Sequence, residues 1–221
     1  MKINYKEPAY NIDIVFCIDS TAGMSCFIDI IKERAIHFYE ELINYAESKS
    51  KHIDNVRIKI VSYRDYLADG ENAMMSTDFF SLPEQSFEFS NIVKSIEAFG
   101  GGDIPEDGLE ALAFCIRSKW NKECSKRRQI IIVWSDAPPH PLGFSSSAQY
   151  YPTNIMAKDF AELTDWWQTY MNRSAKRLIL YTPKLGDWKD IIENWDNVIH
   201  YPITACGGIK DFDYEVIINA L

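Results

Sequence analysis

The feature that most constrains the fold is a continuous apolar run from Gln129 to Ser135, with the sequence QIIIVWS. A run without polar alternation is typical of a central strand covered on both faces. Strand-like and helix-like patterns alternate along the rest of the chain, which predicts a mostly parallel sheet with helices on both faces. We therefore expect a doubly wound, Rossmann-like α/β fold of about six strands, in a single domain spanning residues 1–221.

The individual elements follow from apolar spacing, which has a period of two in strands and of three to four in helices. We expect strands at Ile12–Ile18, Val56–Tyr63, Gln129–Ser135, Lys176–Thr182 and Asn197–Pro202, and a short additional strand at Asp78–Leu82 in a hairpin with the second. We expect helices at Ile28–Tyr45, Phe87–Phe99, Pro105–Trp120, Ala157–Met171, Trp188–Trp195 and Asp211–Leu221.

The charge balance narrows the class of partners. Thirty-two acidic residues against 23 basic ones leave a net charge of −9. Because there is no basic surplus to release phosphate counterions, we expect neither nucleic acid nor an anionic membrane as a partner. One local exception is the stretch Lys122–Arg128 (KECSKRR), which could bind an anion, although a solvated helix end is the plainer interpretation.

The location of the protein is predicted from what the sequence lacks. No apolar stretch approaches the roughly 20 residues of a membrane span, and the first residues contain no apolar signal-peptide core. The five cysteines show no zinc-ligand spacing, and we expect all of them to be reduced thiols. These features predict a cytoplasmic protein, and they leave the oligomeric state open.

Acidic and hydroxyl side chains follow the strands at the edge where folds of this class bind ligands. Asp19–Thr21 follows the first strand, Asp136 ends the central strand, and a glycine-rich turn carries Asp103–Glu106 into the helix between them. Clustered carboxylates repel one another when they are partly desolvated. A divalent cation relieves that repulsion, and oxygen donors of this kind suit Mg²⁺, Mn²⁺ or Ca²⁺.

Each acidic residue also has a plainer role. Asp19 could cap a helix N-terminus, and Asp136, which precedes two prolines, could be a turn residue. Glu106 could serve the first turn of its helix, where the helix dipole favours a negative charge. The metal hypothesis is lost only if all three plainer roles hold together.

Four motifs, DSTAGM, YRDY, GGGDIPEDGLEAL and WSDAPPH, stand in an order that resembles von Willebrand factor type A (vWA) domains. The resemblance covers residues from about Tyr10 to Leu221, and its centre is the metal-ion-dependent adhesion site (MIDAS) of that family. The turn Asp103–Glu106 looks like the variant in integrin β-subunit I-like domains, where a Glu supplies the carboxylate in place of a Thr. The whole set looks most like intracellular vWA domains joined to atypical α-kinases.

The resemblance implies roles for individual residues. The implied metal ligands are Asp19, Thr21, Glu106 and Asp136. The implied supporting residues, or ligands of an adjacent cation, are Ser20, Gly23, Asp65 and Asp103. Ser20 is expected to tighten its loop, and Asp65 to pair with Arg64 or another neighbour. Gly23 stands where the family has a second Ser, so we expect weaker binding of the ion, for which Mg²⁺ is favoured over Mn²⁺ and Ca²⁺.

The loop after Asp136 is rich in Ser and Tyr, a composition typical of adaptable recognition loops. The candidate partner contacts are His140, Phe144, Tyr150 and Tyr151, although a plain surface histidine is the favoured interpretation of His140 and the loop could be disordered.

In family terms, the implied function is recognition of an Asp or Glu on a protein partner, which completes the ion's coordination, in an intracellular multi-protein assembly. We expect no enzyme activity, because no nucleophile is spaced with a base in a defensible way. The alternatives are a metal-free scaffold, which Gly23 favours, and a Mg²⁺-dependent phosphatase using Asp19. The phosphatase is disfavoured because its second Asp would have to stand at Thr21.

Overall fold

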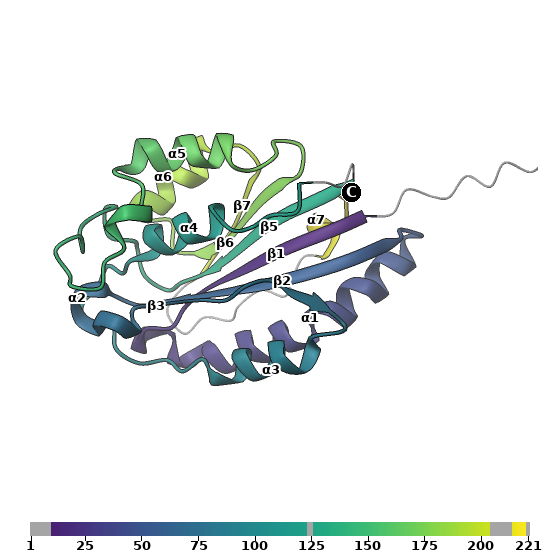
Figure 1. Ribbon diagram of the computed structural model, residues 1–221, viewed down its shortest axis with the longest axis horizontal. Helices are drawn as coiled ribbons and strands as arrows, with labels where there is room; N and C mark the ends of the chain where they lie inside the picture. Colours follow the sequence, from purple (N-terminus) through teal and green to yellow (C-terminus); the bar gives the residue numbers. More distant parts are fainter. Residues whose placement is uncertain (1–9, 123–125, 204–213, 220–221) are drawn as a thin grey trace, which may run out of the picture.

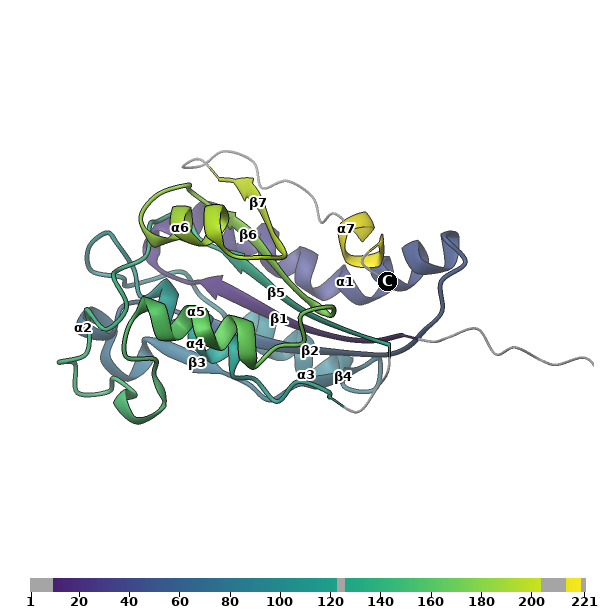
Figure 2. The same ribbon diagram turned by 90° about the horizontal axis from the view of Figure 1, so that it is seen from above.

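A seven-stranded sheet forms the centre of the protein in the computed structural model, which describes residues 10–122, 126–203 and 214–219 (Figures 1 and 2). The strand order is β3-β2-β1-β5-β6-β7, and β4 also pairs with β2. The strands are β1 Tyr10–Asp19, β2 Ile53–Tyr63, β3 Met74–Ser76, β4 Phe80–Leu82, β5 Arg127–Trp134, β6 Lys176–Thr182 and β7 Val198–Pro202. All neighbours pair in parallel except β3 and β4, which are antiparallel to β2.

Helices cover both faces of the sheet, so the expected α/β class is confirmed. They are α1 Ile28–Ser48, α2 Tyr66–Asp69, α3 Ser86–Ser95, α4 Gly108–Ile116, α5 Phe160–Thr169, α6 Asp187–Asn194 and α7 Tyr214–Asn219. Three short 3-10 turns lie at Ala22–Cys26, Gly70–Asn72 and Thr153–Ile155. Helices α1, α3 and α7 lie on one face, and α4, α5 and α6 lie on the other (Figures 1 and 2).

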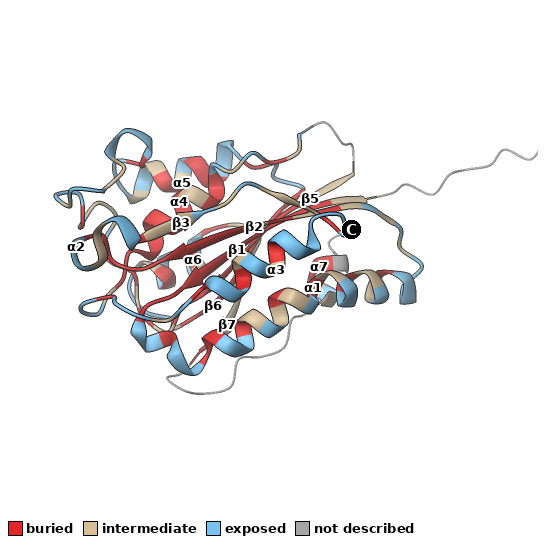
Figure 3. Ribbon diagram, turned by 60° about the horizontal axis from the view of Figure 1, so that its bottom comes forward, coloured by how far each residue is buried: buried red, intermediate tan, exposed pale blue. Residues whose placement is uncertain are grey.

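Alternating side chains of the strands divide the interior into two hydrophobic layers. In β1, Ile14 and Phe16 pack towards α1, whereas Val15 and Cys17 pack towards α4. The strands are therefore buried along most of their length, while the helices keep exposed outer faces (Figure 3). The apolar run of β5 follows from this position, because β5 lies between β1 and β6 with helices over both of its faces.

Several elements differ from the sequence-based expectation: α3 ends at Ser95 rather than Phe99, α5 is shorter at both ends, and the short helix α2 was not expected. Helix α4 begins at Gly108 rather than at Pro105, because the preceding residues are held in a loop: Glu106 N–H donates to Pro138 O, and His140 N–H donates to Glu106 O. Strand β3 forms in a segment with no apolar alternation, because its backbone pairs with the edge of β2 that β1 does not occupy. Of the expected last helix, residues 211–213 and 220–221 lie outside the described residues.

The cysteines correct one expectation. Cys17 and Cys115 are free and buried, as expected, but Cys26 is disulfide-bonded. Cys124 and Cys206 lie outside the described residues. Because cytosolic proteins rarely keep disulfides, the cytoplasmic location stays a prediction. Across the described helices, none combines the length and the apolar character that crossing a bilayer requires.

Candidate functional site

A cavity of about 410 Å³ opens at the carboxyl edge of the sheet, at the end that carries α2 (left in Figure 1). The parallel register Ile18↔Trp134 brings the ends of β1 and β5 side by side, so the loops after them meet here. Among the residues lining the cavity are the predicted site residues Thr21, Gly23, Asp103, Glu106 and Asp136, together with the glycine turn at 100–102. The fold therefore places five of the predicted residues around one opening.

Asp19 lies beneath this cavity and is fully buried. Its Oδ1 accepts hydrogen bonds from the Thr21 amide at 2.9 Å and the Thr21 hydroxyl at 2.7 Å. Its Oδ2 accepts from the Ser135 hydroxyl at 2.7 Å. Burial raises the pKa of Asp19 to about 6, although these three hydrogen bonds favour the charged form and oppose the shift. Asp19 thus fixes the loop that presents the Thr21 side chain.

Glu106 is the least satisfied carboxylate at this edge. Its side chain is only 4% exposed, and among the described residues none donates a hydrogen bond to its Oε2. Burial raises its pKa to about 9, and the negative charges of nearby aspartates, Asp19 first among them, add to the shift. Buried polar groups are almost always partnered, so an orphaned carboxylate oxygen beside a cavity calls for an explanation. A bound cation provides one.

Gly101 allows Glu106 and Thr21 to approach each other. A Cβ at this position would lie 2.8 Å from both Glu106 Oε1 and Thr21 Cβ, and the backbone has φ +97°, which favours glycine. The turn that precedes Glu106 therefore carries glycine because two candidate ligands converge on its backbone.

The structure changes the interpretation of Gly23. A Cβ at Gly23 would lie 2.8 Å from Asp136 Oδ2, so the Asp136 carboxylate fills the space that a serine side chain would need. Asp136 itself is half-buried, and burial raises its pKa. From the sequence, Gly23 is interpreted as the loss of a ligand oxygen. The packing shows in addition that the absence of a side chain at Gly23 makes room for the Asp136 carboxylate.

Arg64 organises the loops at the carboxyl edge of the sheet, a role that sequence reasoning missed. Its guanidinium donates to the backbone oxygens of four residues, namely Ser20, Asn72, Glu97 and Phe99, at 2.8–3.0 Å. It also lies over the Phe99 ring, with 3.7 Å between Cζ and the ring centroid. Ser20 adds a second tie, because its hydroxyl donates to Tyr63 O. The signal in the sequence was a lone cation directly after a strand, among acidic loops.

Asp65 pairs with His140 and not with Arg64. The distance from Asp65 Oδ2 to His140 Nε2 is 3.2 Å, and both side chains are buried. The other oxygen of Asp65 caps α2 by accepting from the amides of Leu67 and Ala68. The remaining supporting residue, Asp103, is exposed at the rim of the cavity.

A second group of ligand-type side chains, Asp65, Asp107 and His140, lies beside the first. One ligand atom from each lies within 4.8 Å of the others, a set that could hold a metal ion. Asp107, which sequence reasoning missed, accepts hydrogen bonds from Tyr66 N–H at 2.7 Å and from the Ser145 hydroxyl at 2.8 Å. Each residue of this group is therefore already hydrogen-bonded within the chain.

Two of the four predicted partner contacts have internal roles instead. His140 is 3% exposed and stacks on Phe144 with 4.1 Å between ring centroids, which corrects its interpretation as a surface histidine in contact with a partner. The Tyr151 hydroxyl donates to Glu110 at 3.1 Å. Phe144 and Tyr150 are exposed, at 53% and 49%. The loop is thus anchored by one pair of aromatic residues and displays the other.

Comparison with known proteins identifies the fold. No protein-family model matches the chain. The pilus adhesin SpaC from Lactobacillus rhamnosus GG superposes with a TM-score of 0.56 at 11% identity, over 90% of this chain and 29% of SpaC. A von Willebrand factor type A protein from Catenulispora acidiphila superposes with a TM-score of 0.53 at 14% identity, over 96% of this chain and 41% of that one. The protein has the fold of a vWA domain.

Two curated relatives are similar in sequence. The alpha-protein kinase vwkA of Dictyostelium discoideum is 29% identical over 142 residues, which is 64% of this chain and 21% of vwkA. The putative ariadne-like RING finger protein R811 of Acanthamoeba polyphaga mimivirus is 25% identical over 173 residues, which is 77% of this chain and 15% of R811. The matched region therefore spans about a fifth or less of each relative. The kinase relative confirms the predicted resemblance to vWA sequences joined to α-kinases.

Proposed function

We propose that the protein is a binding module that holds a divalent cation, Mg²⁺ in the first place, in the cavity at the carboxyl edge and uses it to recognise an Asp or Glu of a protein partner. The observation that carries this proposal is Glu106, a buried carboxylate whose Oε2 has no hydrogen-bond donor among the described residues and which lines an open cavity. A cation there would neutralise the repulsion that makes the charged form of Glu106 costly.

The donor set fits a hard cation. The Thr21 hydroxyl and the carboxylates of Glu106 and Asp136 line the cavity, with Asp19 directly below, and all of these are oxygen ligands. The ion would supply positive charge for a partner carboxylate, which would otherwise meet the carboxylates of Glu106 and Asp136 that line the cavity. The chain's own residues position the loops: Arg64 and Ser20 tie them to β2, and Gly101 lets two ligands converge.

Exposed apolar side chains, one of them lining the cavity and two on neighbouring loops, would provide specificity. Ile104 lines the cavity and is 73% exposed, and Leu185, at 58%, precedes Gly186, which packs against Pro139. Phe144 stands above His140 on the neighbouring loop. Interfaces draw most of their energy from a few such apolar anchors around a polar centre.

The open cavity is a better ion site than the group formed by Asp65, Asp107 and His140. The two aspartates already accept hydrogen bonds from backbone amides, and His140 pairs with Asp65. An ion in that group would have to displace these bonds, and the group is at most 3% exposed, which leaves a partner no access. We therefore assign the group a structural role, in which it anchors the loop after β5 to α2.

We also propose that the protein binds rather than catalyses, and that it acts in the cytoplasm. The buried His140 at this edge pairs with Asp65, and among the described residues it has no hydrogen bond to a serine or cysteine that it could activate as a nucleophile.

The test is a thermal melt of the chelator-stripped protein, titrated with Mg²⁺ and Mn²⁺. Binding to the native state raises the melting temperature with ion concentration. We expect a saturable rise in the wild type, which the isosteric variants Glu106→Gln and Asp136→Asn abolish and the matched control Asp107→Asn retains. Loss of the rise in Asp107→Asn alone would place the ion in the buried group instead. Absence of any rise at millimolar ion, in a folded sample, would refute the intrinsic site.

The partner half of the proposal needs its own measurement. An array of acidic peptides is probed with the protein in Mg²⁺ and again in chelator. We expect binding that requires the ion and that is lost when the peptide's Asp or Glu becomes Asn or Gln. Binding that survives both changes would contradict carboxylate recognition, even if the ion site itself is established by the melts.

A further inference from the structure

A second pocket, of about 190 Å³, lies at the opposite end of the sheet, where β1, β5 and β6 begin. Nearly all of its lining side chains carry hydrogen-bond donors: Tyr10, Lys126, Arg127, Arg128, Asn172 and Ser174. The pocket includes part of the basic stretch Lys122–Arg128, of which residues 123–125 lie outside the described residues. The candidate cation site does not use any of these side chains.

Strand pairing brings the cations together. The parallel register sets Arg128 opposite Ile12 on β1, next to the start of that strand at Tyr10. On the other side, Arg177 of β6 pairs with Ile130, two residues further along β5. Because parallel strands all begin at the same edge, basic residues at the start of β5 and β6 are forced into one neighbourhood.

The ring of Tyr10 is the centre of this cluster. Lys126 Nζ lies 5.1 Å from its centroid, and Lys51 Nζ and Arg128 Cζ each lie 5.9 Å from it. Each cation gains a modest attraction from the ring face. Three cations around one ring also repel one another, and an anion among them would relieve that repulsion.

Arg128 gives the second, independent observation. Its Nε is buried, and in the described part of the chain no acceptor reaches it, although Nη1 donates to Arg127 O at 2.9 Å. Burial lowers the pKa of Arg128, and the positive charge of Arg177 lowers it further. Buried polar groups are almost always hydrogen-bonded, so the unpartnered Nε of Arg128 calls for an acceptor. Because a second guanidinium lies nearby, an acceptor with negative charge is favoured.

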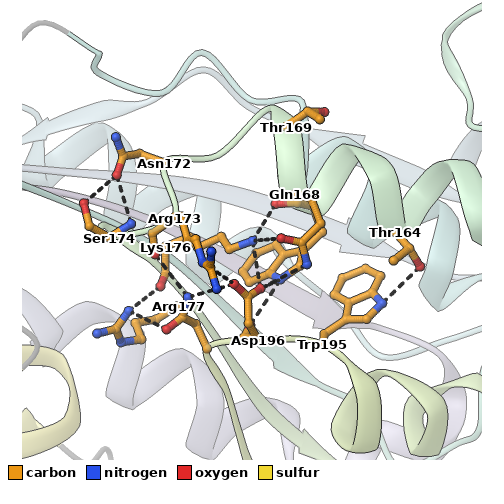
Figure 4. Close-up of polar contacts among 12 residues, drawn as sticks. Thr164, Gln168, Thr169, Asn172, Arg173, Ser174, Lys176, Arg177, Trp195 and Asp196 are labelled. Atoms are coloured by element: carbon orange, nitrogen blue, oxygen red, sulfur yellow. Dashed lines mark hydrogen bonds and ion pairs between the residues drawn. The ribbon is translucent and has the colours of Figure 1, made fainter.

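Asp196, the carboxylate that precedes β7 at this end, already pairs with other cations of the chain. Asp196 Oδ1 accepts from the fully buried Lys176 ammonium at 2.9 Å, and Oδ2 lies 3.6 Å from Arg173 (Figure 4). The side-chain oxygen of Asn172 is also already hydrogen-bonded, because Oδ1 accepts from both the amide and the hydroxyl of Ser174 (Figure 4). The remaining polar group of Asn172 is its NH₂, which is a donor.

We propose that this pocket binds a phosphoryl group carried on a serine or threonine of a partner polypeptide. Guanidinium, ammonium and amide donors match the several acceptor oxygens of a phosphate, and arginine clusters are a recurring means of recognising phosphorylated side chains. The volume suits one such group with its attachment and is below the range typical of nucleotide-sized ligands. A single pocket differs from the extended basic track that nucleic acid requires.

The experiment is isothermal titration calorimetry in chelator, at low salt, so that the cation site does not contribute. The probe is a blocked pentapeptide, Gly-Gly-phosphoserine-Gly-Gly, with the unphosphorylated peptide and inorganic phosphate as comparisons. We expect the protein to bind the phosphopeptide and to bind the unphosphorylated peptide and inorganic phosphate much more weakly or not at all. We expect Arg128→Gln to weaken phosphopeptide binding about tenfold or more, because it removes one charge-assisted contact. Arg117→Gln is the matched control, because it removes the same charge from an arginine that does not line the pocket.

Circular dichroism melts check that both variants fold as the wild type does. Equal binding of the two peptides, or equal affinity of Arg128→Gln and wild type in folded samples, would overturn the proposal. Inorganic phosphate binding as tightly as the phosphopeptide would overturn the polypeptide source and leave a free-anion pocket. Binding to phosphatidylinositol-phosphate vesicles or to single-stranded DNA, without binding to the phosphopeptide, would overturn it in favour of those ligands.

Discussion

The two ends of the sheet carry opposite charge. At the carboxyl edge, the loops bury the carboxylates of Asp19, Glu106, Asp107 and Glu110, each at most 4% exposed. At the amino edge, two adjacent strands begin at a cation, β5 at Arg127 and β6 at Lys176. The net charge of −9 conceals this separation. A weakly acidic total therefore excludes a general affinity for anions but says nothing about a single pocket at one end.

The ends also differ in the sign of the buried groups that lack a partner among the described residues. Lys176 at the amino edge donates to Trp167 O and Gln168 and pairs with Asp196 (Figure 4). At the carboxyl edge, Glu106 and Glu110 each keep one buried oxygen without a donor in the described part of the chain. Arg64, a buried cation at this edge, binds backbone oxygens rather than carboxylates. In the described part of the chain, each end thus keeps buried polar atoms without a partner: carboxylate oxygens at the carboxyl edge, and the Nε donor of Arg128 at the amino edge.

The largest expected effect on stability comes from Arg64→Ala. This substitution leaves four backbone oxygens of the acidic edge without their charged donor, so we expect a loss of about 3–5 kcal/mol in the free energy of unfolding. Urea unfolding at pH 7 measures it. The control is Arg117→Ala, which removes one carbonyl contact and the cation–π contacts with Trp166 and Tyr170 from an exposed arginine, and should cost about 1 kcal/mol. Similar losses in the two variants would contradict the role given to Arg64.

At the amino edge, removing either partner of the Lys176–Asp196 ion pair should lower the free energy of unfolding by different amounts. Asp196→Asn leaves the fully buried Lys176 charge without its counter-ion, and we expect a loss of about 3 kcal/mol. Lys176→Met leaves Asp196, which is 29% exposed and can be hydrated, so we expect a loss of about 1 kcal/mol. Urea unfolding of both variants gives the comparison, and the reverse order would show that the pair is not governed by burial of the lysine.

The acidic edge predicts a specific pH dependence of the metal-free protein. Because the folded-state pKa of Glu106 is raised from about 4.5 to about 9, its contribution to stability is complete below about pH 4.5 and is lost as pH rises towards 9. Glu106→Gln mimics the neutral form, so in chelator we expect it to exceed wild type by more than about 1 kcal/mol at pH 9 and to match it near pH 4.5. Denaturant unfolding at three pH values tests this, and identical pH profiles would refute it.

The smallest effect separates two explanations of Gly23. Gly23→Ala displaces the Asp136 carboxylate, whose Oδ2 lies 2.8 Å from the new Cβ, without supplying an oxygen. Gly23→Ser causes the same displacement but adds a hydroxyl ligand. We expect Ala to weaken the Mg²⁺-dependent rise in melting temperature several-fold, by about 1 kcal/mol of binding energy, and Ser to restore part of it. Unchanged Mg²⁺ binding in Gly23→Ala would show that Asp136 is not a ligand.

Much of the architecture was predictable because burial leaves a local record in the sequence. The apolar run at Gln129–Ser135 identified β5 as a central strand, and the order of strands and helices then implied that the loops at Asp19 and Asp136 meet at one edge. The short strand β3 was not predictable, because backbone pairing with β2 stabilises it and no apolar alternation marks it. Helix α4 also begins later than its pattern suggests, because the loop before it is bonded to the loop after β5.

What the sequence by itself determined is the fold class and the set of oxygen-bearing side chains at one edge of the sheet, since both depend on residue type and on periodicity over a few positions. Only the tertiary structure decided which residues of the chain contact one another at this edge. His140 binds Asp65 across 75 residues, Gly23 makes room for the carboxylate of Asp136, and Arg64 gathers backbone oxygens from separate loops. The physical reason is that such contacts depend on how the loops pack around one another, and no local pattern in the chain encodes that packing.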